Sequence, residues 1–255
     1  MAKHVVIPAR YASSRLPGKP LALISGVPMI IHVAALATKT MADNVVIAVD
    51  DQRVLDVVVG AGYQGLMTRV EHPSGSDRVM QVADEMGWGE EDVVINIQGD
   101  EPMLPPQVVD DLFKAMVART KIEMATLSEL ITNRGDFLDP NVVKVVVGDG
   151  LRAINFSRAP IPYSRESIDD EELFNAFMQS GMARRHIGIY GFRVSGLRDF
   201  VSLGESRLER IEKLEQLRWI EAGRDLLVLD VRQRVPGGVD TPEDLARVQK
   251  EFVSS

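Results

Sequence analysis

The sequence predicts an α/β protein with a mostly parallel sheet, helices on both faces, and an inserted region of mixed or antiparallel strands. Two observations predict this fold class. Strand-like and helix-like segments alternate through the first half of the chain, and four extended segments follow one another in the middle. At 255 residues, 45% of them hydrophobic, the chain is long enough to bury a core. We therefore expect one domain over residues 1–255, with the insertion at about 124–195.

The first half of the chain supplies the parallel part of the predicted sheet. Runs rich in valine and isoleucine predict buried strands at 5–7, 45–49 and 93–97. Apolar residues at helical spacing predict helices near 29–38, 52–61 and 106–119. Parallel strands joined through a helix form right-handed crossovers, so this alternation places helices on both faces of the sheet.

The middle of the chain changes character. Extended segments are predicted at 124–131, 142–147, 153–156 and 185–193. Residues 164–172 are rich in acidic residues and serine, which predicts a mobile, solvated loop. We expect this region to form mixed or antiparallel strands that serve as a lid or as a contact between subunits.

Two later helices carry sequence signals for their starts. Ser206 and Glu209 form a capping box, followed by apolar positions 208, 211, 214, 217 and 220 and by Gly223, which together predict one helix. Thr241 and Asp244 repeat the capping pattern around Pro242 and predict a C-terminal helix that continues through Leu245 and Val248.

Composition excludes several classes of function. The formal net charge of −8 disfavours binding to nucleic acid or to an anionic membrane, because both need a broad basic surface. Cysteine is absent, which excludes disulfides, a thiolate nucleophile and a zinc–thiolate site, and fits a reducing compartment. We see no signal peptide and no apolar run of membrane-spanning length, so we expect a cytoplasmic protein without membrane insertion.

The segment 7–20 follows the first predicted strand, at the edge where open α/β sheets bind ligands. Gly18 allows the backbone to approach a ligand closely, and cations and hydroxyls accompany it, a combination that suits a polyphosphate. These side chains are Arg10, Ser13, Ser14, Arg15 and Lys19. The segment matches neither the Walker loop nor the Gly-x-Gly-x-x-Gly fingerprint. The alternative is a surface turn fixed by prolines, in which the arginines pair with nearby acids.

Two carboxylates are candidates for binding a metal ion. Asp100 follows the predicted central strand 93–97, and Asp240 lies between Gly237-Gly238 and a helix start whose N-cap is already supplied by Thr241. Magnesium is commonly held by one or two carboxylates together with substrate phosphates and water. The alternatives are an ordinary turn after the strand for Asp100 and helix capping for Asp240.

Three further groups are weaker candidates. Ser74 and Arg78 lie at a predicted helix start, where anions bind, but Ser74 is equally explained as a cap. His186 and Tyr190 share one face of a predicted strand and, with Arg158, could bind a polyhydroxylated acid; the alternative is a solvent-facing surface. Periodicity alone gives no functional reason for the helical residues Glu215 and Gln216.

Seven ordered blocks resemble the 3-deoxy-manno-octulosonate cytidylyltransferase family over nearly the whole chain. They are Ile7-Pro-Ala-Arg-Tyr-Ala-Ser-Ser-Arg-Leu-Pro-Gly-Lys-Pro20, Ser74-Gly-Ser-Asp-Arg78, Gln98-Gly-Asp-Glu-Pro102, Phe156-Ser-Arg158, Arg185-His-Ile-Gly-Ile-Tyr-Gly191, Leu214-Glu-Gln-Leu-Arg218 and Val239-Asp-Thr-Pro-Glu-Asp-Leu245. Two departures are conservative: Ser76-Asp77 stands where the family has Thr-Glu, and Gly191-Phe192 where it has Gly-Tyr.

The resemblance implies a single nucleotidyltransferase domain built on a Rossmann-like nucleotide-binding sheet. Such a domain couples CTP to 3-deoxy-D-manno-octulosonate (Kdo), giving CMP-Kdo and pyrophosphate for lipopolysaccharide biosynthesis. It implies that Lys19, Arg15 and Asp100 are catalytic, and that Mg²⁺ is held by Asp100 and Asp240. CTP would be bound by Arg10, Ser13, Arg15, Lys19, Ser74, Arg78 and Gln98. The sugar acid would be bound by Arg158, His186, Tyr190, Glu215 and Gln216. A homodimer formed by the middle segment is also implied.

Three alternatives remain open at this point. The substrate could be 8-amino-3,8-dideoxy-manno-octulosonate, which differs from Kdo at one terminal group. A nucleotide-sugar glycosyltransferase uses a similar nucleotide-binding sheet but releases CMP or UDP instead of pyrophosphate. A non-catalytic nucleotide sensor would bind CTP without turnover, and it would leave Asp100 and Asp240 without a function.

Overall fold

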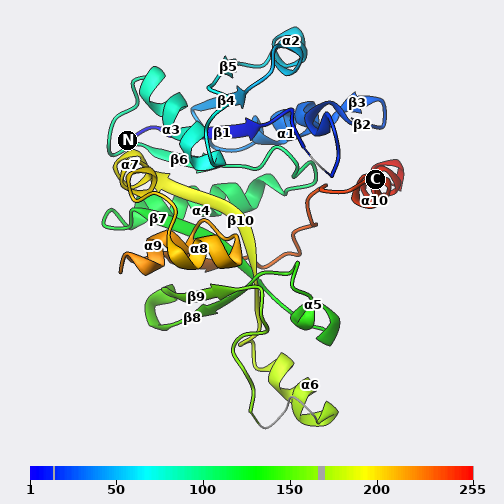
Figure 1. The fold of residues 1–255 in the computed structure, drawn as a ribbon, viewed down its shortest axis with the longest axis vertical. Helices are drawn as coiled ribbons and strands as arrows, with labels where there is room; N and C mark the ends of the chain where they lie inside the picture. Colours follow the sequence, from blue (N-terminus) through cyan, green and yellow to red (C-terminus); the bar gives the residue numbers. More distant parts are fainter. Residues whose placement is uncertain (14, 166–169, 255) are drawn as a thin grey trace.

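The computed structural model describes residues 1–13, 15–165 and 170–254, and within them one nine-stranded sheet forms the centre of the molecule (Figure 1). Its strands are β1 (Lys3–Ala9), β4 (Asn44–Val49), β5 (Gly65–Met67), β6 (Val93–Asn96), β7 (Met124–Leu130), β8 (Lys144–Val147), β9 (Ala153–Ser157), β10 (Arg184–Arg193) and β11 (Leu227–Asp230). A separate hairpin joins β2 (Leu23–Ile24) to β3 (Val27–Pro28).

The sheet is parallel on both sides of one antiparallel strand. Its order is β11-β7-β10-β6-β1-β4-β5, and all pairings among β5, β4, β1 and β6 are parallel, as is that of β7 with β11. Strand β10 runs antiparallel to both of its neighbours, β6 and β7, and β8 and β9 extend the sheet as an antiparallel pair. The predicted fold class is confirmed.

Helices cover both faces of the sheet. They are α1 (Met29–Ala37), α2 (Gln52–Gly60), α3 (Gly75–Glu85), α4 (Pro106–Ala118), α5 (Arg134–Leu138), α6 (Glu171–Gln179), α7 (Val194–Ser202), α8 (Arg207–Glu212), α9 (Leu217–Glu221) and α10 (Pro242–Ser254), with 3₁₀ turns at Lys19–Leu21 and Asp149–Leu151. The three helices predicted in the first half are present, each one residue shorter than predicted. No helix in the described ranges is long and apolar enough to cross a membrane.

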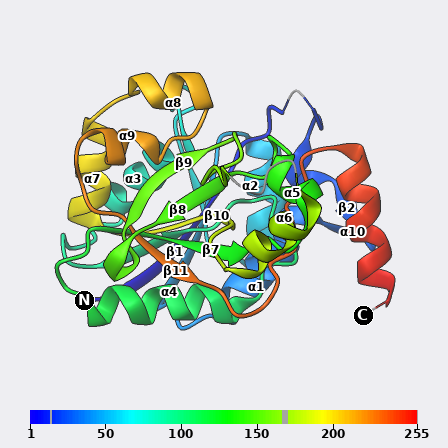
Figure 2. The same ribbon diagram turned by 90° about the horizontal axis from the view of Figure 1, so that it is seen from below.

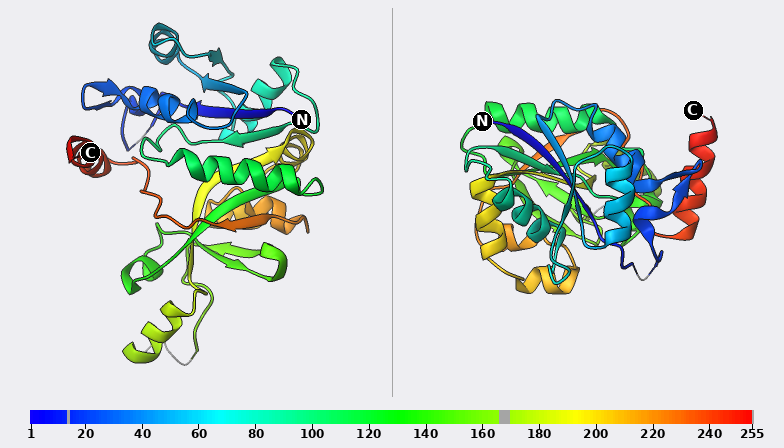
Figure 3. Two further views of the ribbon diagram at one scale, coloured as in Figure 1. Left: turned by 180° about the vertical axis from the view of Figure 1, so that it is seen from behind. Right: turned by 90° about the horizontal axis from the view of Figure 1, so that it is seen from above.

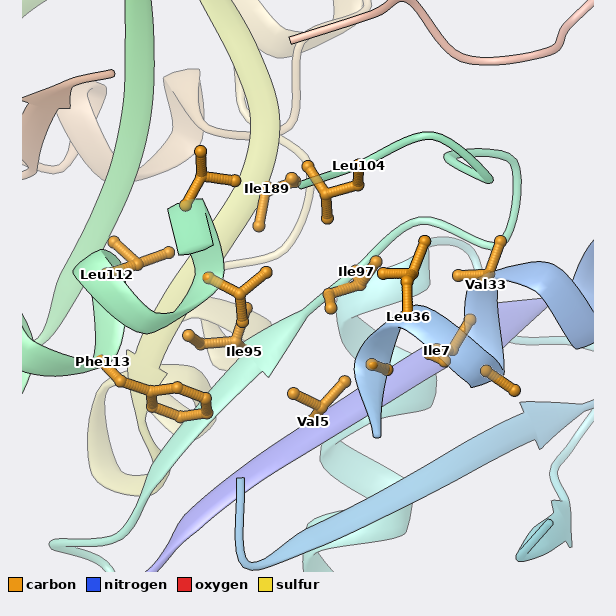
Figure 4. Close-up of a cluster of buried hydrophobic side chains, with 14 of the residues drawn as sticks. Val5, Ile7, Val33, Leu36, Ile95, Ile97, Leu104, Leu112, Phe113 and Ile189 are labelled. Atoms are coloured by element: carbon orange, nitrogen blue, oxygen red, sulfur yellow. The ribbon is translucent and has the colours of Figure 1, made fainter. Parts of the chain in front are cut away.

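The two faces of the sheet bury different side chains of the same strands. In β1, Val5 and Ile7, both labelled in Figure 4, belong to the core beneath α1, α2 and α4. Val6 belongs to the core beneath α3, α7 and α9. Figure 3 shows the helices on both sides of the sheet. These strands are hydrophobic throughout because both of their faces are covered. Full burial of each such side chain stabilises the fold by about 1.5–3 kcal/mol.

The middle of the chain contributes to the central sheet and also extends beyond it. The four predicted extended segments correspond to β7, β8, β9 and β10, while β8, β9, α5 and α6 extend below the central sheet in Figure 1. Helices α5 and α6 share a small core that includes Phe137 and Phe174. The predicted loop at 164–172 is shorter than expected, because Asp170 caps α6 and Glu171 begins it; residues 166–169 lie outside the described residues.

The prediction of a single helix after Ser206 is wrong, because the structure has two short helices there. The capping box forms, but Lys213 adopts a left-handed conformation with φ 54° and ends α8, and α9 begins at Leu217. The break lets Arg218 reach back to Glu209, with its Nε 2.8 Å from Glu209 Oε2. Nine residues of unbroken helix would separate these positions by about 14 Å along the axis. A buried ion pair has therefore taken precedence over helical periodicity.

The predicted C-terminal helix is present as α10. Thr241 Oγ1 accepts a hydrogen bond from Asp244 N at 3.2 Å, which is the predicted cap. The helix packs beside the β2–β3 hairpin, with Val248 and Ile24 in one apolar cluster (Figure 2). This packing fixes the start of α10, and with it Asp240, close to the end of β1.

Candidate active site

A cavity of about 350 Å³, which we call the first cavity, lies at the carboxyl ends of β1 and β6. Residues predicted from four separate parts of the sequence meet in its lining. They are Arg10, Ser13, Arg15, Lys19, Arg78, Gln98, Asp100 and Asp240. Ser14 lies outside the described residues. The position agrees with the rule that open α/β sheets bind ligands beyond the carboxyl ends of their strands.

Lys19 joins the two predicted metal-binding carboxylates. Its ammonium donates a short hydrogen bond to Asp100 and a second to Asp240 at 2.8 Å, and Arg15 lies 3.1 Å from the same Asp240 oxygen. Burial lowers the pKa of Lys19, but Asp100 and Asp240 outweigh that effect and raise it above its ordinary value. Lys19 is therefore a fixed positive charge in the wall of the first cavity.

Gly99 allows Asp100 to approach the end of β1. A Cβ at this position would lie 2.8 Å from the backbone oxygen of Pro8, so any larger residue would push the turn away from the strand. The Asp100 backbone oxygen also accepts a hydrogen bond from Val239 N at 2.8 Å. The two carboxylates are thus positioned by the backbone as well as by Lys19.

The donor set fits a magnesium ion that has further ligands from a substrate. Asp100 and Asp240 share one cation, Lys19, and two carboxylates are what magnesium usually takes from a protein when phosphate oxygens and water complete its octahedron. Among the described residues, no group of three or more His, Cys, Asp or Glu side chains could hold a metal ion without such ligands.

Arg78 and Ser74 lie beside the first cavity, at the start of α3. The Arg78 side chain is fully buried, donates to Thr68 Oγ1, and lies 3.2 Å from Asp50. Asp50 therefore explains how a cation is tolerated in the first turn of a helix. Ser74 is the N-cap of α3, with its Oγ 3.3 Å from Asp77 N, and the adjacent Gly75 faces the cavity.

A second group of predicted residues forms what we call the polar cluster, on the α3 face of the sheet. Tyr190 donates to Gln216 Oε1 at 2.9 Å, Ser76 donates to Glu215 at 3.1 Å, and His186 Nε2 lies 2.9 Å from Thr126 Oγ1. The cluster consists of Ser76, Thr126, His186, Tyr190, Glu215 and Gln216. The helix break at Lys213 places Glu215 and Gln216 in a turn that faces Ser76 and Tyr190, where Gln216 is buried and Glu215 is half-buried.

Burial controls protonation in the polar cluster. Burial, and after it the nearby charge of Arg185, together lower the pKa of His186 to about 3, so the imidazole is neutral near pH 7. Burial also raises the pKa of Glu215 above its ordinary value, against the opposing effect of its hydrogen bond from Ser76. His186 therefore offers the cluster a hydrogen bond without a positive charge.

A second cavity, of about 190 Å³, lies beside His186 and is lined partly by Glu101, Arg185 and Gly238. Sequence reasoning assigned no role to Glu101, although it adjoins Asp100. Burial and then the negative charge of Asp100 raise the pKa of Glu101 to about 8. Gln98 links the two cavities, since its amide lies 3.5 Å from the Gly188 carbonyl oxygen. The sequence did contain one signal for Glu101, namely that this carboxylate adjoins Asp100, the predicted metal ligand.

Arg158 does not join the other predicted sugar-acid residues. Its Nε donates to the Glu212 carbonyl oxygen at 2.8 Å, and one terminal nitrogen donates to the Pro140 carbonyl oxygen at 3.1 Å. Arg158 is absent from the linings of the first and second cavities. Here its guanidinium connects β9 to the end of α8, and its contact with a substrate stays a prediction.

Comparison with known proteins agrees with this geometry. A cytidylyltransferase family model matches residues 4–226. Curated 3-deoxy-manno-octulosonate cytidylyltransferases from Pseudomonas fluorescens and Cellvibrio japonicus are each 46% identical to the chain; the first match covers 96% of both proteins, and the second covers 98% of this chain and 97% of the relative.

A solved structure of CMP:2-keto-3-deoxy-manno-octonic acid synthetase complexed with CTP has the same fold. It matches with a TM-score of 0.90 and 39% sequence identity, over 100% of this chain and 99% of that chain. Sequence and fold therefore agree over essentially the full length, and the chain belongs to the cytidylyltransferase family, among the 3-deoxy-manno-octulosonate cytidylyltransferases.

Proposed function

We propose that the chain transfers the cytidylyl group of CTP to 3-deoxy-D-manno-octulosonate, giving CMP-Kdo and pyrophosphate for lipopolysaccharide biosynthesis. The observation that carries this proposal is the convergence of Lys19, Asp100 and Asp240 in the first cavity, next to the polar cluster. One site suits a triphosphate with its metal ion, and the other suits a polyhydroxylated acid. A reaction that joins two such substrates needs both.

In this reaction the anomeric hydroxyl of the sugar acid attacks the α-phosphorus of CTP, and pyrophosphate leaves in line. Arg10, Arg15 and Lys19 hold the triphosphate and neutralise the charge that develops on the leaving pyrophosphate. Lys19 exchanges at least part of its contact with the two carboxylates for contact with phosphate. The two carboxylates raise the pKa of Lys19 before the exchange, and phosphate oxygens supply the neighbouring negative charge after it.

Asp100 and Asp240 would hold Mg²⁺ once the phosphates are present. When bound, the ion neutralises phosphate charge and can lower the pKa of a coordinated hydroxyl. The contact of Lys19 with both carboxylates supports this assignment, because the two side chains already share one cation. Arg15, 3.1 Å from Asp240, adds a second cation beside that carboxylate.

The polar cluster would take the sugar acid. His186 is neutral, so it contributes a hydrogen bond and no positive charge. Tyr190, Glu215 and Gln216 offer further donors and acceptors, which suits hydroxyl groups. The carboxylate of the acid needs a cation, and Arg158 would provide it after exchanging its contacts with the carbonyl oxygens of Pro140 and Glu212.

We further propose that the protein is a homodimer formed through the middle segment and acts in the cytoplasm. The part of the molecule that extends below the sheet exposes Leu138, Ile154, Leu173 and Met182, which favours burial against a second copy. The cysteine-free sequence is compatible with a reducing compartment. Light scattering on the purified chain tests the dimer: a monomer mass at micromolar concentration would contradict it.

The activity is tested by incubating the chain with CTP, Mg²⁺ and Kdo, measuring pyrophosphate, and determining the product mass. We expect stoichiometric pyrophosphate and CMP-Kdo. Release of CMP or UDP would instead indicate a glycosyltransferase, and CTP binding without turnover would indicate a nucleotide sensor. Turnover only with the 8-amino analogue would overturn the sugar assignment and retain the reaction type.

A further inference from the structure

Asn96 is a buried polar residue to which the site described so far gives no role. Its side chain is fully buried at the end of β6, and neither Nδ2 nor Oδ1 has a hydrogen-bond partner among the described residues. Buried amide groups are almost always paired, because an unpaired one loses its hydrogen bonds to water without replacement. An amide with both atoms unpaired needs an explanation.

The position of Asn96 places it against the polar cluster. Asn96 lies directly opposite Tyr190 in the antiparallel pairing of β6 with β10, so both side chains project from the same face of the sheet. The packing of nearby residues supports this placement, since Val94, two positions before Asn96, and Tyr190 both belong to the core on the α3 face. The cluster has a third unpaired amide atom, Gln216 Nε2, from a side chain that is 1% exposed.

Asn96 also lies directly behind the first cavity. A Cβ added to Gly75 would lie 3.5 Å from Pro8 and 3.8 Å from Asn96 Nδ2, so Gly75 separates the amide from the cavity that Gly75 and Pro8 line. The amide is thus between the predicted nucleotide site and the predicted sugar-acid site. Only small groups, a glycine and a proline ring, stand between it and the first cavity.

We propose that Asn96 is a specificity-determining residue for the sugar acid, and that its amide hydrogen-bonds a hydroxyl group of that substrate. A hydroxyl both donates and accepts, so it can satisfy Oδ1 and Nδ2 together, and a second hydroxyl can accept from Gln216 Nε2. This inference rests on the proposed function and refines it. It assigns three orphaned atoms to a polyol, the substrate class that matches their mixture of donors and acceptors.

Two hydrogen bonds close the cluster in the structure, and the substrate would replace them. They are Tyr190 to Gln216 and Ser76 to Glu215. Both acceptors come from the turn between α8 and α9, which follows the left-handed Lys213. A displacement of this turn exposes Asn96 without disturbing the sheet, and substrate hydroxyls then take the place of the lost partners.

The test is the variant Asn96→Leu, which has a similar shape but no polar atoms. A residue whose amide is unpaired in the free protein but paired with substrate gives a distinctive result: the melting temperature is unchanged or raised, while KM for Kdo rises about 10- to 100-fold. KM for CTP stays within twofold of wild type. Asn155→Leu, at an exposed strand position on β9, is the matched control and should leave both KM values unchanged.

The outcomes separate this inference from the proposed function. If the wild type releases no pyrophosphate with Kdo, the proposed function fails. If the wild type is active and Asn96→Leu keeps its KM for Kdo, the role of Asn96 is refuted, and a lowered melting temperature would then show a purely structural role. Should Asn96→Leu not fold, Asn96→Ala replaces it; this variant too must raise KM for Kdo selectively, and an unchanged KM refutes the inference.

Discussion

The ammonium of Lys19 lies 2.8 Å from a carboxylate oxygen of Asp240, although 221 residues separate them in the chain. This contact joins the loop after β1 to the segment that enters α10. The same ammonium also contacts Asp100, which follows β6. One side chain therefore connects three parts of the chain at the point where the triphosphate is proposed to bind, and several predictions concern this arrangement and its surroundings.

Replacing Lys19 with glutamine removes the cation that would stabilise the leaving pyrophosphate. Loss of one preorganised charge-stabilising group typically costs about 2.7–4 kcal/mol, so we expect kcat to fall by roughly 10²–10³-fold. Steady-state pyrophosphate release measures this. Lys39→Gln, at an exposed position after α1, is the control and should retain wild-type kinetics. A Lys19→Gln enzyme with wild-type kcat would remove Lys19 from the mechanism.

Asp100→Asn tests the proposed metal site. The amide keeps the shape of the side chain but loses its charge, so we expect turnover to be nearly abolished, with the melting temperature within a few degrees of wild type. Half-saturation by Mg²⁺ in the residual activity should shift to higher concentration, since a carboxylate ligand is lost. The exposed Asp111→Asn on α4 is a matched control. Wild-type activity in Asp100→Asn would refute the metal assignment.

The half-buried imidazole of His186 should make stability depend on pH. Its pKa is about 3 in the folded protein and about 6.5 when unfolded. Between these values the unfolded state binds more protons, so the free energy of unfolding falls as pH is lowered through 6.5 toward 3. At pH 5.5 the loss from this one group is about 1.4 kcal/mol.

Urea unfolding at pH 7.5 and pH 5.5 checks the prediction when wild type is compared with His186→Gln. Other histidines, including the buried His4, contribute equally to both proteins. The variant should therefore lose about 1.4 kcal/mol less than wild type on acidification. Equal losses in the two proteins would show that His186 takes up its proton in the folded state.

The ion pair between Arg218 and Glu209 should be important for stability. Both side chains are buried, and Arg218→Met would leave an unpaired carboxylate, at a typical cost of about 3–5 kcal/mol. The double variant Arg218→Met with Glu209→Met should recover part of that loss. Arg207→Met breaks an ion pair in which the arginine is exposed, and should cost at most about 1 kcal/mol. Denaturant titration distinguishes these cases; equal losses in the two arginine variants would contradict the argument.

Local sequence signals predicted the parts of the fold that depend on local chemistry. Hydrophobic runs identified β1, β4 and β6, and capping residues identified the starts of α8 and α10. The break after Glu212 was missed because its cause is the pairing of Arg218 with Glu209, which depends on tertiary structure. Periodicity describes one helix at a time and carries no information about such a partner.

Most residues of the candidate site could be predicted from the sequence, but fewer of the interactions among them could. Placement after strand ends brought Asp100 and Lys19 together correctly, because carboxyl ends of parallel strands share one edge of the sheet. The anion beside Arg78 was not predicted, since Asp50 lies on a different strand end. No sequence feature pointed to Asn96 either. An asparagine at the end of a hydrophobic strand is unremarkable, and its lack of hydrogen-bond partners is visible only in the structure.

Strand β10 has a consequence for how the chain is made. It lies between β6 and β7, which precede it in the sequence, so β6 keeps one unpaired edge until residue 193 has left the ribosome. Strand β11 then joins β7 from residues 227–230. Nascent chains that contain β6 but lack β10 present an apolar strand edge, which favours aggregation or chaperone binding during synthesis.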